Sequence, residues 1–180
     1  MAAPRIFRRF PLNLGLGTDI CHVLRIEGIL RSTRGIRFVR KILNPDERGH
    51  PKICWLLSPH SQAALSQDVQ RRLTESSSCT NEPELEETQD DLKSAQDIHI
   101  AAKFVAGRFA AKEAVIKAHP HQALTWHDIT IQSQAAPHPG RNGAPLAIIH
   151  GAKEDHEALV SISHDGEYAT AVCLGAGPAL

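Results

Sequence analysis

The sequence lacks the features that mark membrane, secreted and nucleic-acid-binding proteins. No apolar run approaches the roughly 18 residues needed to span a bilayer, which excludes a transmembrane protein. The chain has no net charge, with 20 Lys and Arg against 20 Asp and Glu, so it has no bulk attraction to nucleic acid or to an anionic membrane. No secretory signal precedes the four cysteines and no C-x-x-C pair occurs, so reduced thiols are expected.

The signatures of several enzyme classes are also missing. The eleven histidines include no H-x-x-x-H on a helix and no Cys/His cluster with zinc-ligand spacing, which argues against zinc. Neither a G-x-x-x-x-G-K-[ST] phosphate loop nor a G-x-S-x-G nucleophile elbow occurs. A kinase, a two-metal phosphohydrolase and a serine hydrolase are therefore disfavoured.

The 180 residues suit one domain with an insertion. Residues 1–44 hold nine basic side chains against two acidic ones, whereas residues 68–97 hold nine acidic against three basic. We predict a basic N-terminal arm over 1–11 and a folded domain over 12–180. Apolar periodicity disappears at about 49–97, which predicts a mobile, polar and acidic insertion with some helix near 62–73.

Hydrophobic periodicity and turn residues predict an α+β fold with a mostly antiparallel sheet packed around one long helix. The long helix is expected over 98–119, where Pro120 stops it, after two short basic helices within 26–43. Asn44 is expected to cap a helix that has Pro45 in its first turn. Strands are predicted at 12–20, 128–134, 145–150, 158–164 and 167–174, the last two forming a hairpin around Asp165-Gly166. In the first strand, Gly15 and Gly17 would let another backbone or a phosphate approach closely.

The predicted long helix carries charges that admit two interpretations. Glu113 and Lys117 share one face, and Arg108 and Lys112 share an adjacent one. These residues form either a solvated stripe or a phosphate-binding face with a Mg²⁺ ligand. Asp19, the only acid in the first strand, is either a cap or the second carboxylate ligand. Ser163 and His164 either satisfy hairpin backbone groups or bind phosphate.

Several motifs occur together in one order: Gly15-Leu-Gly-Thr-Asp19-Ile, Lys41-Ile-Leu-Asn-Pro-Asp-Glu47, Gly107-Arg-Phe-Ala-Ala-Lys-Glu113-Ala-Val-Ile-Lys117, Asn142-Gly-Ala-Pro145 and Ser161-Ile-Ser-His164. In this combination the chain resembles the holo-[acyl-carrier-protein] synthase type of 4′-phosphopantetheinyl transferase. The resemblance covers nearly everything except 1–11 and about 49–97. The segment Leu124-Thr-Trp-His-Asp128 and the acidic insertion resemble the fungal mitochondrial branch of this family.

The resemblance implies a reaction, a cofactor and a partner. Coenzyme A would donate its 4′-phosphopantetheine group to a serine hydroxyl of apo acyl carrier protein for fatty acid biosynthesis, releasing 3′,5′-ADP, with Mg²⁺ held by Asp19 and Glu113. Asp19, Glu113 and Lys117 would be catalytic. Arg25 and the basic helices would meet the acidic carrier protein, which agrees with the charge distribution. The residues implied to contact the coenzyme are Arg108, Lys117, Asn142, Gly143, Pro145, Ser163 and His164.

The family also implies a homotrimer with the coenzyme between subunits, which would place His164 and Asp19 of one site on different chains. One position departs from the family pattern, because His22 stands where relatives often have Glu, three residues after Asp19. This departure favours an alternative, a degenerate relative that binds coenzyme A or carrier protein without transfer. Retention of Asp19, Glu113 and Lys117 favours transfer. The basic, acid-free start predicts a mitochondrial protein, with the cytoplasm as the alternative.

Overall fold

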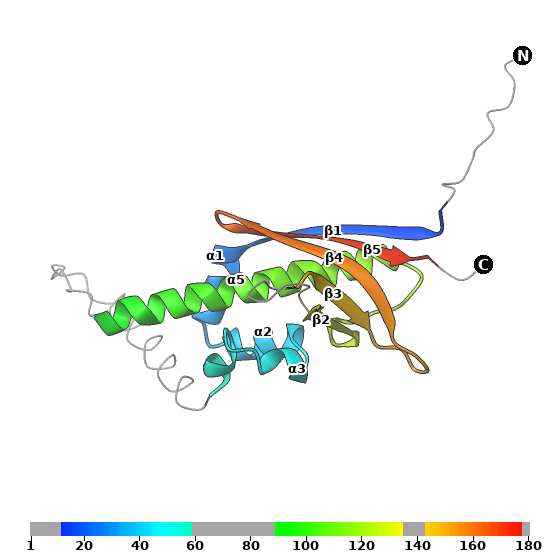
Figure 1. Ribbon diagram of the computed structural model, residues 1–180. Coiled ribbons are helices and arrows are strands. Elements are labelled where there is room, and N and C mark those ends of the chain that lie inside the picture. The colour runs from blue at the N-terminus through cyan, green and yellow to red at the C-terminus, as the bar shows by residue number, and fades with distance from the viewer. Residues whose placement is uncertain (1–11, 59–88, 135–142, 178–180) are drawn as a thin grey trace, which may run out of the picture.

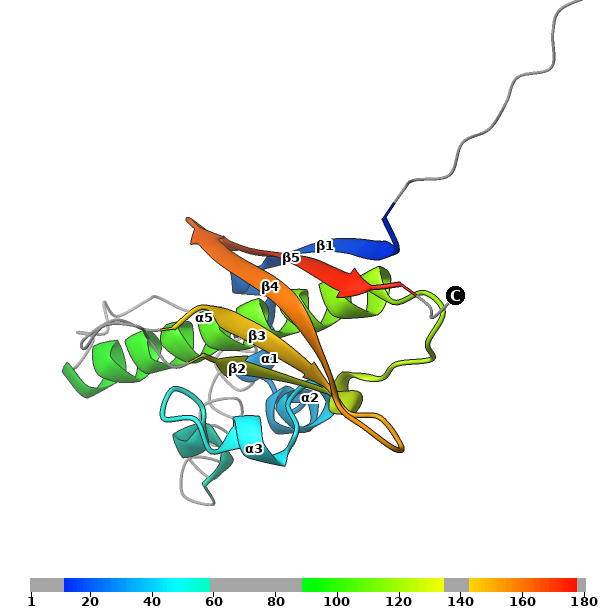
Figure 2. The same ribbon diagram turned by 45° about the vertical axis from the view of Figure 1, so that its right-hand side comes forward.

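A five-stranded antiparallel sheet and one long helix form the framework of the computed structural model, which describes residues 12–58, 89–134 and 143–177, with only the backbone at 89–93. The sheet has the strand order β1-β5-β4-β3-β2. Helix α5 lies between the sheet and the short helices α1, α2 and α3 (Figures 1 and 2). The predicted fold class is confirmed. The strands are β1 Leu14–His22, β2 Ile129–Ser133, β3 Pro145–Ile149, β4 His156–Asp165 and β5 Tyr168–Ala176.

Strand β1 packs with its backbone directly against α5 (Gln89–Ala118), because two glycines leave room. A Cβ on Gly17 would collide with the carbonyl oxygen of Ala114, and one on Gly15 with that of Ala118. The sequence allowed either another backbone or a phosphate beside these glycines, and the structure places the backbone of α5 there. The alternation of β1 then directs Asp19 and Cys21 to the same side as Gly17, toward α5.

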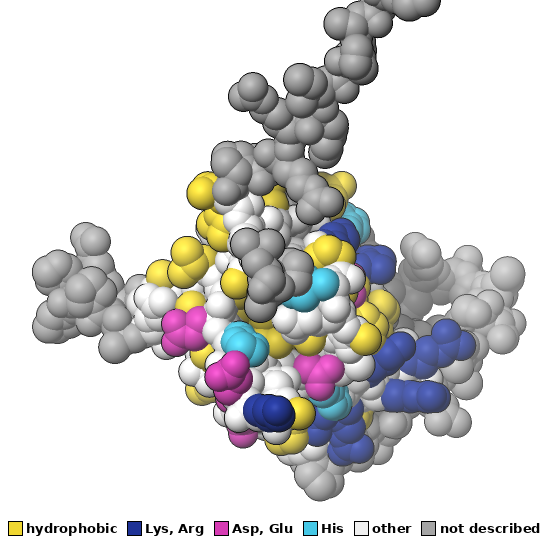
Figure 3. Space-filling model, turned by 90° about the vertical axis from the view of Figure 1, so that its right-hand side faces the viewer, with side chains coloured by type: hydrophobic (Ala, Val, Ile, Leu, Met, Phe, Trp, Pro, Cys, Tyr) yellow, Lys and Arg dark blue, Asp and Glu magenta, His cyan; other side chains and the backbone are white. Residues whose placement is uncertain are grey.

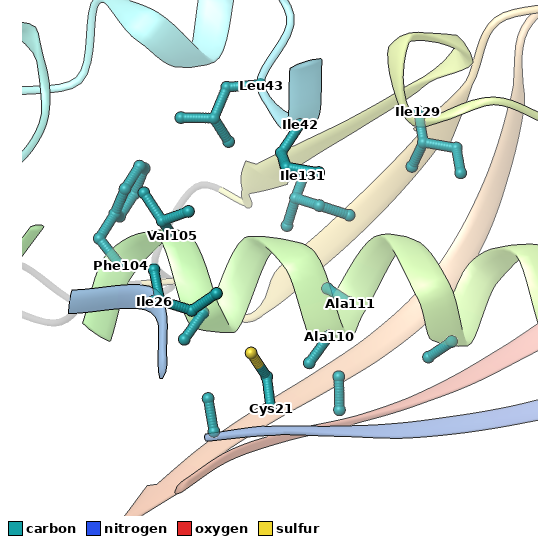
Figure 4. Packing of buried hydrophobic residues seen from close by; sticks show 14 of the residues in the cluster. Cys21, Ile26, Ile42, Leu43, Phe104, Val105, Ala110, Ala111, Ile129 and Ile131 are labelled. Atoms are coloured by element: carbon teal, nitrogen blue, oxygen red, sulfur yellow. The ribbon is translucent and has the colours of Figure 1, made fainter. Parts of the chain in front are cut away.

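The first helices form as the sequence predicts. Two short helices form here, α1 (Val23–Leu30) and α2 (Gly35–Ile42), and their apolar residues Ile26 and Ile42 are fully buried. Helix α2 is basic as predicted, whereas α1 holds one arginine and one glutamate. Helix α3 (Pro45–Arg48) begins with a complete capping box, in which Asn44 accepts from the Glu47 backbone and donates its own N–H to the Glu47 carboxylate. Figure 4 shows these elements directing their apolar side chains onto α5.

The ends of the predicted insertion belong to the core fold. A short 3₁₀ helix, η1 (Cys54–Leu57), follows α3, and Ile53 and Leu56 are completely buried. Helix α5 begins at Gln89 rather than near Ile98, and its first turns extend past the sheet (Figure 1). Of the helix residues before Ile98, only Leu92 and Ala95 are apolar in the sequence, which is too few to show a helical period. The helix expected near 62–73 and the arm over 1–11 lie outside the described residues.

The second half of the chain builds the remaining strands and one short helix. Strands β4 and β5 form the predicted hairpin, but Asp165 is still paired with Tyr168, so the two turn residues are Gly166 and Glu167 rather than Asp165 and Gly166. Gly166 has a positive φ of 50°. Helix α5 ends at Ala118, before Pro120, and the chain reaches β2 through the 3₁₀ helix η2 (Trp126–Asp128). In the described part of the chain, no helix is both long enough and apolar enough to cross a membrane.

One face of the sheet, on the side away from α5, exposes a row of apolar side chains. Leu16 of β1 lies opposite Leu174 of β5, which in turn lies opposite Leu159 of β4. The exposed fraction of Leu16 is 70% and that of Leu159 is 61%. Such a contiguous exposed patch is typical of an interaction surface. Its apolar residues are Leu14, Leu16, Ile20, Leu159, Val172 and Leu174.

Candidate active site

The charged residues of α5 fall into two groups with different surroundings, and Lys112 belongs to the interior. Its ammonium is fully buried, donates to the carbonyl oxygens of Ile42 at 2.9 Å and Trp126 at 2.8 Å, and forms an ion pair with the buried Glu47 carboxylate. Burial lowers the pKa of Lys112 and the Glu47 charge opposes this. Lys112 thus ties α5 to α2, α3 and η2, and neither the solvated-stripe nor the phosphate-face interpretation holds for it.

Lys117 reaches the other way, to the acid of β1. Its ammonium donates to Asp19 Oδ1 at 2.8 Å and to the Thr18 carbonyl oxygen at 3.0 Å. The hydrogen bond that Lys117 donates to Asp19 and the charges of Asp19 and Glu113 raise the pKa of Lys117, so its ammonium stays protonated. Asp19 Oδ2 is buried and has no hydrogen-bond partner. A buried carboxylate oxygen without a partner in the protein is suited to bind a ligand from outside the chain.

Glu113 stands one helical turn before Lys117 and is half-buried. Its Oε1 accepts a hydrogen bond of 2.7 Å from the indole N–H of Trp126. The carboxylate also borders a cavity of about 600 Å³ between the end of α2, α5 and the segment that leads to η2. That cavity is lined by Lys41, Glu113, Ile116, Leu124, Thr125, Trp126 and His127.

The carboxylates of Asp19 and Glu113 fit a magnesium ion. Both act on the Lys117 ammonium, and one of them has the unpartnered buried oxygen. Among residues 12–58, 94–134 and 143–177, no group of three or more His, Cys, Asp or Glu side chains could hold a metal. A cation here would therefore complete its shell with water and substrate oxygens, which is how Mg²⁺ binds beside phosphates.

Arg108 lies at a second cavity of about 440 Å³, formed by α3, α5 and β2. Its guanidinium lies 4.7 Å above the Phe104 ring, and the ring of His50 stacks on the same Phe104 at 4.3 Å. Arg108 Nε is 3.8 Å from Glu47 Oε1 and makes no hydrogen bond. Burial and the neighbouring Arg108 charge lower the pKa of His50, so this imidazole is neutral at pH 7. A cation with an unused donor at a cavity wall favours an anionic ligand.

The other predicted coenzyme residues lie around the same part of α5. His164 Nε2 is 3.1 Å from the Lys103 carbonyl oxygen, and its ring packs against Gly107, where a Cβ would come within 3.0 Å. Pro145 starts β3 opposite Ser133, which lines the Arg108 cavity. Gly143 packs on the backbone of Gln134 at the same end of that hairpin. Ser163 is exposed on β4, and Asn142 lies outside the described residues.

One helix thus carries both halves of the candidate site. Arg108 precedes Glu113 by five residues and Lys117 by nine, which at 1.5 Å per residue is about 7.5 and 13.5 Å along the axis. An extended ligand with a phosphate near Arg108 could therefore present a second group to Asp19, Glu113 and Lys117. The sequence indicated most of these residues, but it assigned no role in the site to Trp126 or Glu47, although both lie in the motifs quoted, because their roles arise from contacts with distant parts of the chain.

Arg25 and His22 lie at opposite margins of this site. The exposed Arg25 guanidinium is 5.6 Å from the centre of the Phe109 ring, which in turn lies 5.9 Å from Trp126. Most Lys and Arg side chains seen in Figure 3 gather on one side of the molecule, as the basic residues of α1 and α2 predict. His22 lies on the opposite face of β1 from Asp19 and pairs with Glu167 at 3.1 Å, so it takes no part in the Asp19 cluster of its own chain.

Comparison with known proteins identifies the family of the chain. The protein family described as ACPS, 4′-phosphopantetheinyl transferase superfamily, matches residues 15–173. The mitochondrial 4′-phosphopantetheinyl transferase B of Aspergillus fumigatus is 32% identical over 174 residues, 93% of this chain and 97% of that protein. The holo-[acyl-carrier-protein] synthase of Cupriavidus taiwanensis is 28% identical over 169 residues, 89% of this chain and 88% of that protein. The crystal structure of Helicobacter pylori holo-[acyl-carrier-protein] synthase in complex with coenzyme A shares the fold, with a TM-score of 0.50 and 22% identity over 88% of this chain and 96% of that one.

Proposed function

The chain belongs to the 4′-phosphopantetheinyl transferase superfamily, and from this premise we propose that it transfers 4′-phosphopantetheine from coenzyme A to a serine of apo acyl carrier protein. In this reaction the serine oxygen bonds to the β-phosphorus, the bond to 3′,5′-ADP breaks, and the serine proton leaves. The observation that supports the proposal best is the cluster of Asp19, Lys117 and Glu113, which joins β1 to α5 at the positions of the family motif.

Asp19 and Glu113 would hold Mg²⁺, and when bound the ion would neutralise charge on the coenzyme diphosphate. The Lys117 ammonium adjoins both carboxylates and stays protonated, so it provides a second fixed positive charge for the phosphoryl group in transfer. Lys117 also orients Asp19 by holding Oδ1, which leaves the buried Oδ2 for a ligand. The Gly15 and Gly17 contacts with α5 bring these groups together.

The cavity at Arg108 would take the nucleotide end of coenzyme A. Its cationic wall at Arg108, held over the Phe104 ring, suits the phosphate groups of the nucleotide. Gly143 and Pro145 lie at the β2–β3 end of this cavity, and His164 lies across α5 from it. Together with Asn142 and Ser163, these residues complete the proposed coenzyme contacts.

Arg25 and the basic residues of α1 and α2 would bind the acidic carrier protein. Arg25 is exposed and, through Phe109 and Trp126, adjoins Glu113, so a carrier bound there would present its serine near the carboxylates. Opposite charges on the two proteins accelerate their encounter.

We also propose a homotrimer, for which the apolar face of β1, β5 and β4 provides the contact surface. Burying Leu16, Leu159 and their neighbours between copies would remove an exposed apolar area that is costly in water. Packing of this kind would bring one chain's hairpin beside its neighbour's β1, so that His164 and Asp19 of one site come from different chains.

A degenerate relative that binds coenzyme A or carrier protein without transfer is the second candidate, motivated by His22 in place of Glu. The structure weakens this motive, because His22 and Asp19 lie on opposite faces of β1 and the carboxylates of Asp19 and Glu113 are both retained. We propose that the transfer takes place in mitochondria and serves fatty acid biosynthesis, and the 32% identity to the mitochondrial Aspergillus protein supports the location.

Intact-mass spectrometry of apo acyl carrier protein tests the proposed function. After incubation with the chain, coenzyme A and Mg²⁺, the carrier should gain one phosphopantetheine arm, and EDTA should prevent the gain. Glu113→Ala should abolish the gain while the circular dichroism spectrum is unchanged, since alanine is favoured within a helix. Coenzyme A binding without any mass gain by the wild-type chain would instead support the degenerate relative.

A further inference from the structure

Trp126 makes a direct and well-aligned contact with the proposed metal ligand Glu113. The indole N–H donates to Glu113 Oε1 at 2.7 Å, a distance typical of a charge-assisted hydrogen bond. The tryptophan side chain has one hydrogen-bond donor and no acceptor, so in this contact the indole N–H is the donor and the carboxylate oxygen is the acceptor. The indole occupies one of the two carboxylate oxygens, and the other is left for a cation.

Trp126 is itself held from three directions. Its carbonyl oxygen accepts from the buried Lys112 ammonium at 2.8 Å, which fixes the backbone of η2. Its ring lies 5.9 Å from that of Phe109 on one side, and the Lys41 ammonium lies 5.0 Å from the ring centre. The capping box of Thr125 and Asp128 closes the turn around it. The donor is therefore in a set position before any ligand binds.

From this geometry we propose that Trp126 is a positioning residue for divalent-cation binding, acting through Glu113. The terminal torsion of a glutamate is broad, so an unheld carboxylate samples orientations that do not meet the cation. The indole hydrogen bond selects one orientation, in the same way that outer partners of metal-ligating side chains orient them in other proteins. The inference rests on the proposed function only in assigning Glu113 as a ligand.

The experiment makes the same replacement, tryptophan by phenylalanine, at two positions of the full-length chain. Trp126→Phe removes the N–H but keeps an aromatic ring beside Phe109 and Lys41, and Trp55→Phe changes the only other tryptophan, which packs against the core near η1. Mn²⁺ binding is measured by electron paramagnetic resonance with coenzyme A and without carrier protein, so that no transfer occurs. We expect Trp126→Phe to weaken Mn²⁺ binding about tenfold and Trp55→Phe to leave it unchanged.

Two further readouts separate positioning from a structural role. The transfer rate of Trp126→Phe should fall at low Mg²⁺ and return toward the wild-type rate at saturating Mg²⁺, whereas a damaged fold would not be rescued by the ion. In the Trp55→Phe chain Trp126 is the sole indole, so Mn²⁺ should quench its fluorescence, and adding Glu113→Gln should abolish the quenching. This second readout does not depend on the folding of Trp126→Phe.

Equal Mn²⁺ affinity of the wild-type and Trp126→Phe chains, or no quenching of Trp126 by Mn²⁺, would overturn the inference. The proposed function fails separately: a wild-type chain that binds Mn²⁺ through Glu113 but transfers nothing would refute transfer and leave the role of Trp126 intact. Transfer by the wild-type chain with a metal dependence that Trp126→Phe does not alter would refute only the positioning role.

Discussion

Lys112→Met is expected to destabilise the protein strongly, because Lys112 lies in the interior and makes its contacts within the fold. The substitution keeps the length and apolar stem of the side chain but removes the ammonium, leaving Glu47 charged with its carboxylate only 3% exposed. The carbonyl oxygens of Ile42 and Trp126 lose their donor as well. The Glu47 carboxylate still accepts hydrogen bonds from the backbone N–H groups of Asn44 and Ile131.

The size of the effect follows from the buried pair. Removing one partner of a buried ion pair costs about 3–5 kcal/mol. The remaining backbone donors favour the lower end, so we expect a loss of about 3 kcal/mol out of a total of about 5–15 kcal/mol. For a chain of this size that corresponds to a fall in Tm of about 6–12 °C.

Urea denaturation followed by circular dichroism measures this loss, and Lys117→Met is the matched control on the same helix. Lys117 is half-exposed, so its substitution should change stability by less than about 1 kcal/mol while lowering transfer by at least about a hundredfold. Adding Glu47→Gln to Lys112→Met should recover part of the lost stability, because the buried carboxylate is removed, and the recovery should be incomplete because Arg108 then loses its Glu47 partner. A Lys112→Met chain as stable as the wild type would refute the buried ion pair.

Three other outcomes are expected. Gly17→Ala should lower the free energy of unfolding by about 3 kcal/mol in thermal melts, because its Cβ meets the Ala114 carbonyl oxygen, whereas Gly28→Ala, in open space within α1, should raise it by up to about 1 kcal/mol. Burial alone would raise the pKa of Glu27, but hydrogen bonds from His99 and Arg31 outweigh it and lower that pKa. Glu27→Gln should therefore cost about 1 kcal/mol at pH 7, and urea titrations should show the difference vanishing below pH 4.5, as the pH falls through the folded-state pKa. Arg25→Glu should raise KM for carrier protein more than KM for coenzyme A, and equal changes in steady-state assays would remove Arg25 from the docking surface.

Most of the fold could be predicted from the sequence because its signals are local. The Asn44 cap and the hairpin turn at Gly166 are encoded within three or four residues. The cap forms as expected, and the turn lies one residue later than predicted. The start of α5 was missed for the same reason, since its first turns lack the apolar period on which the prediction depends.

The candidate site was only partly predictable. Asp19, Glu113 and Lys117 were identified from their motif, and the structure places Lys117 against Asp19. The same reasoning could not separate Lys112 from Lys117, although they are five residues apart on one helix and one is buried while the other is exposed. It also gave no role to Trp126, thirteen residues beyond the Glu113 that it contacts.

By itself the sequence determined the order of elements, the room for a close neighbour beside Gly15 and Gly17, and the carboxylates and lysine of the proposed site. These follow from glycine sterics, capping and residue spacing, which act along a short stretch of chain. The tertiary structure alone decided which lysine is buried, which donor holds Glu113 and which face of the sheet stays exposed. Those outcomes depend on desolvation, and the atoms that exclude water come from elements as far apart as Glu47 and Lys112, separated by 65 residues.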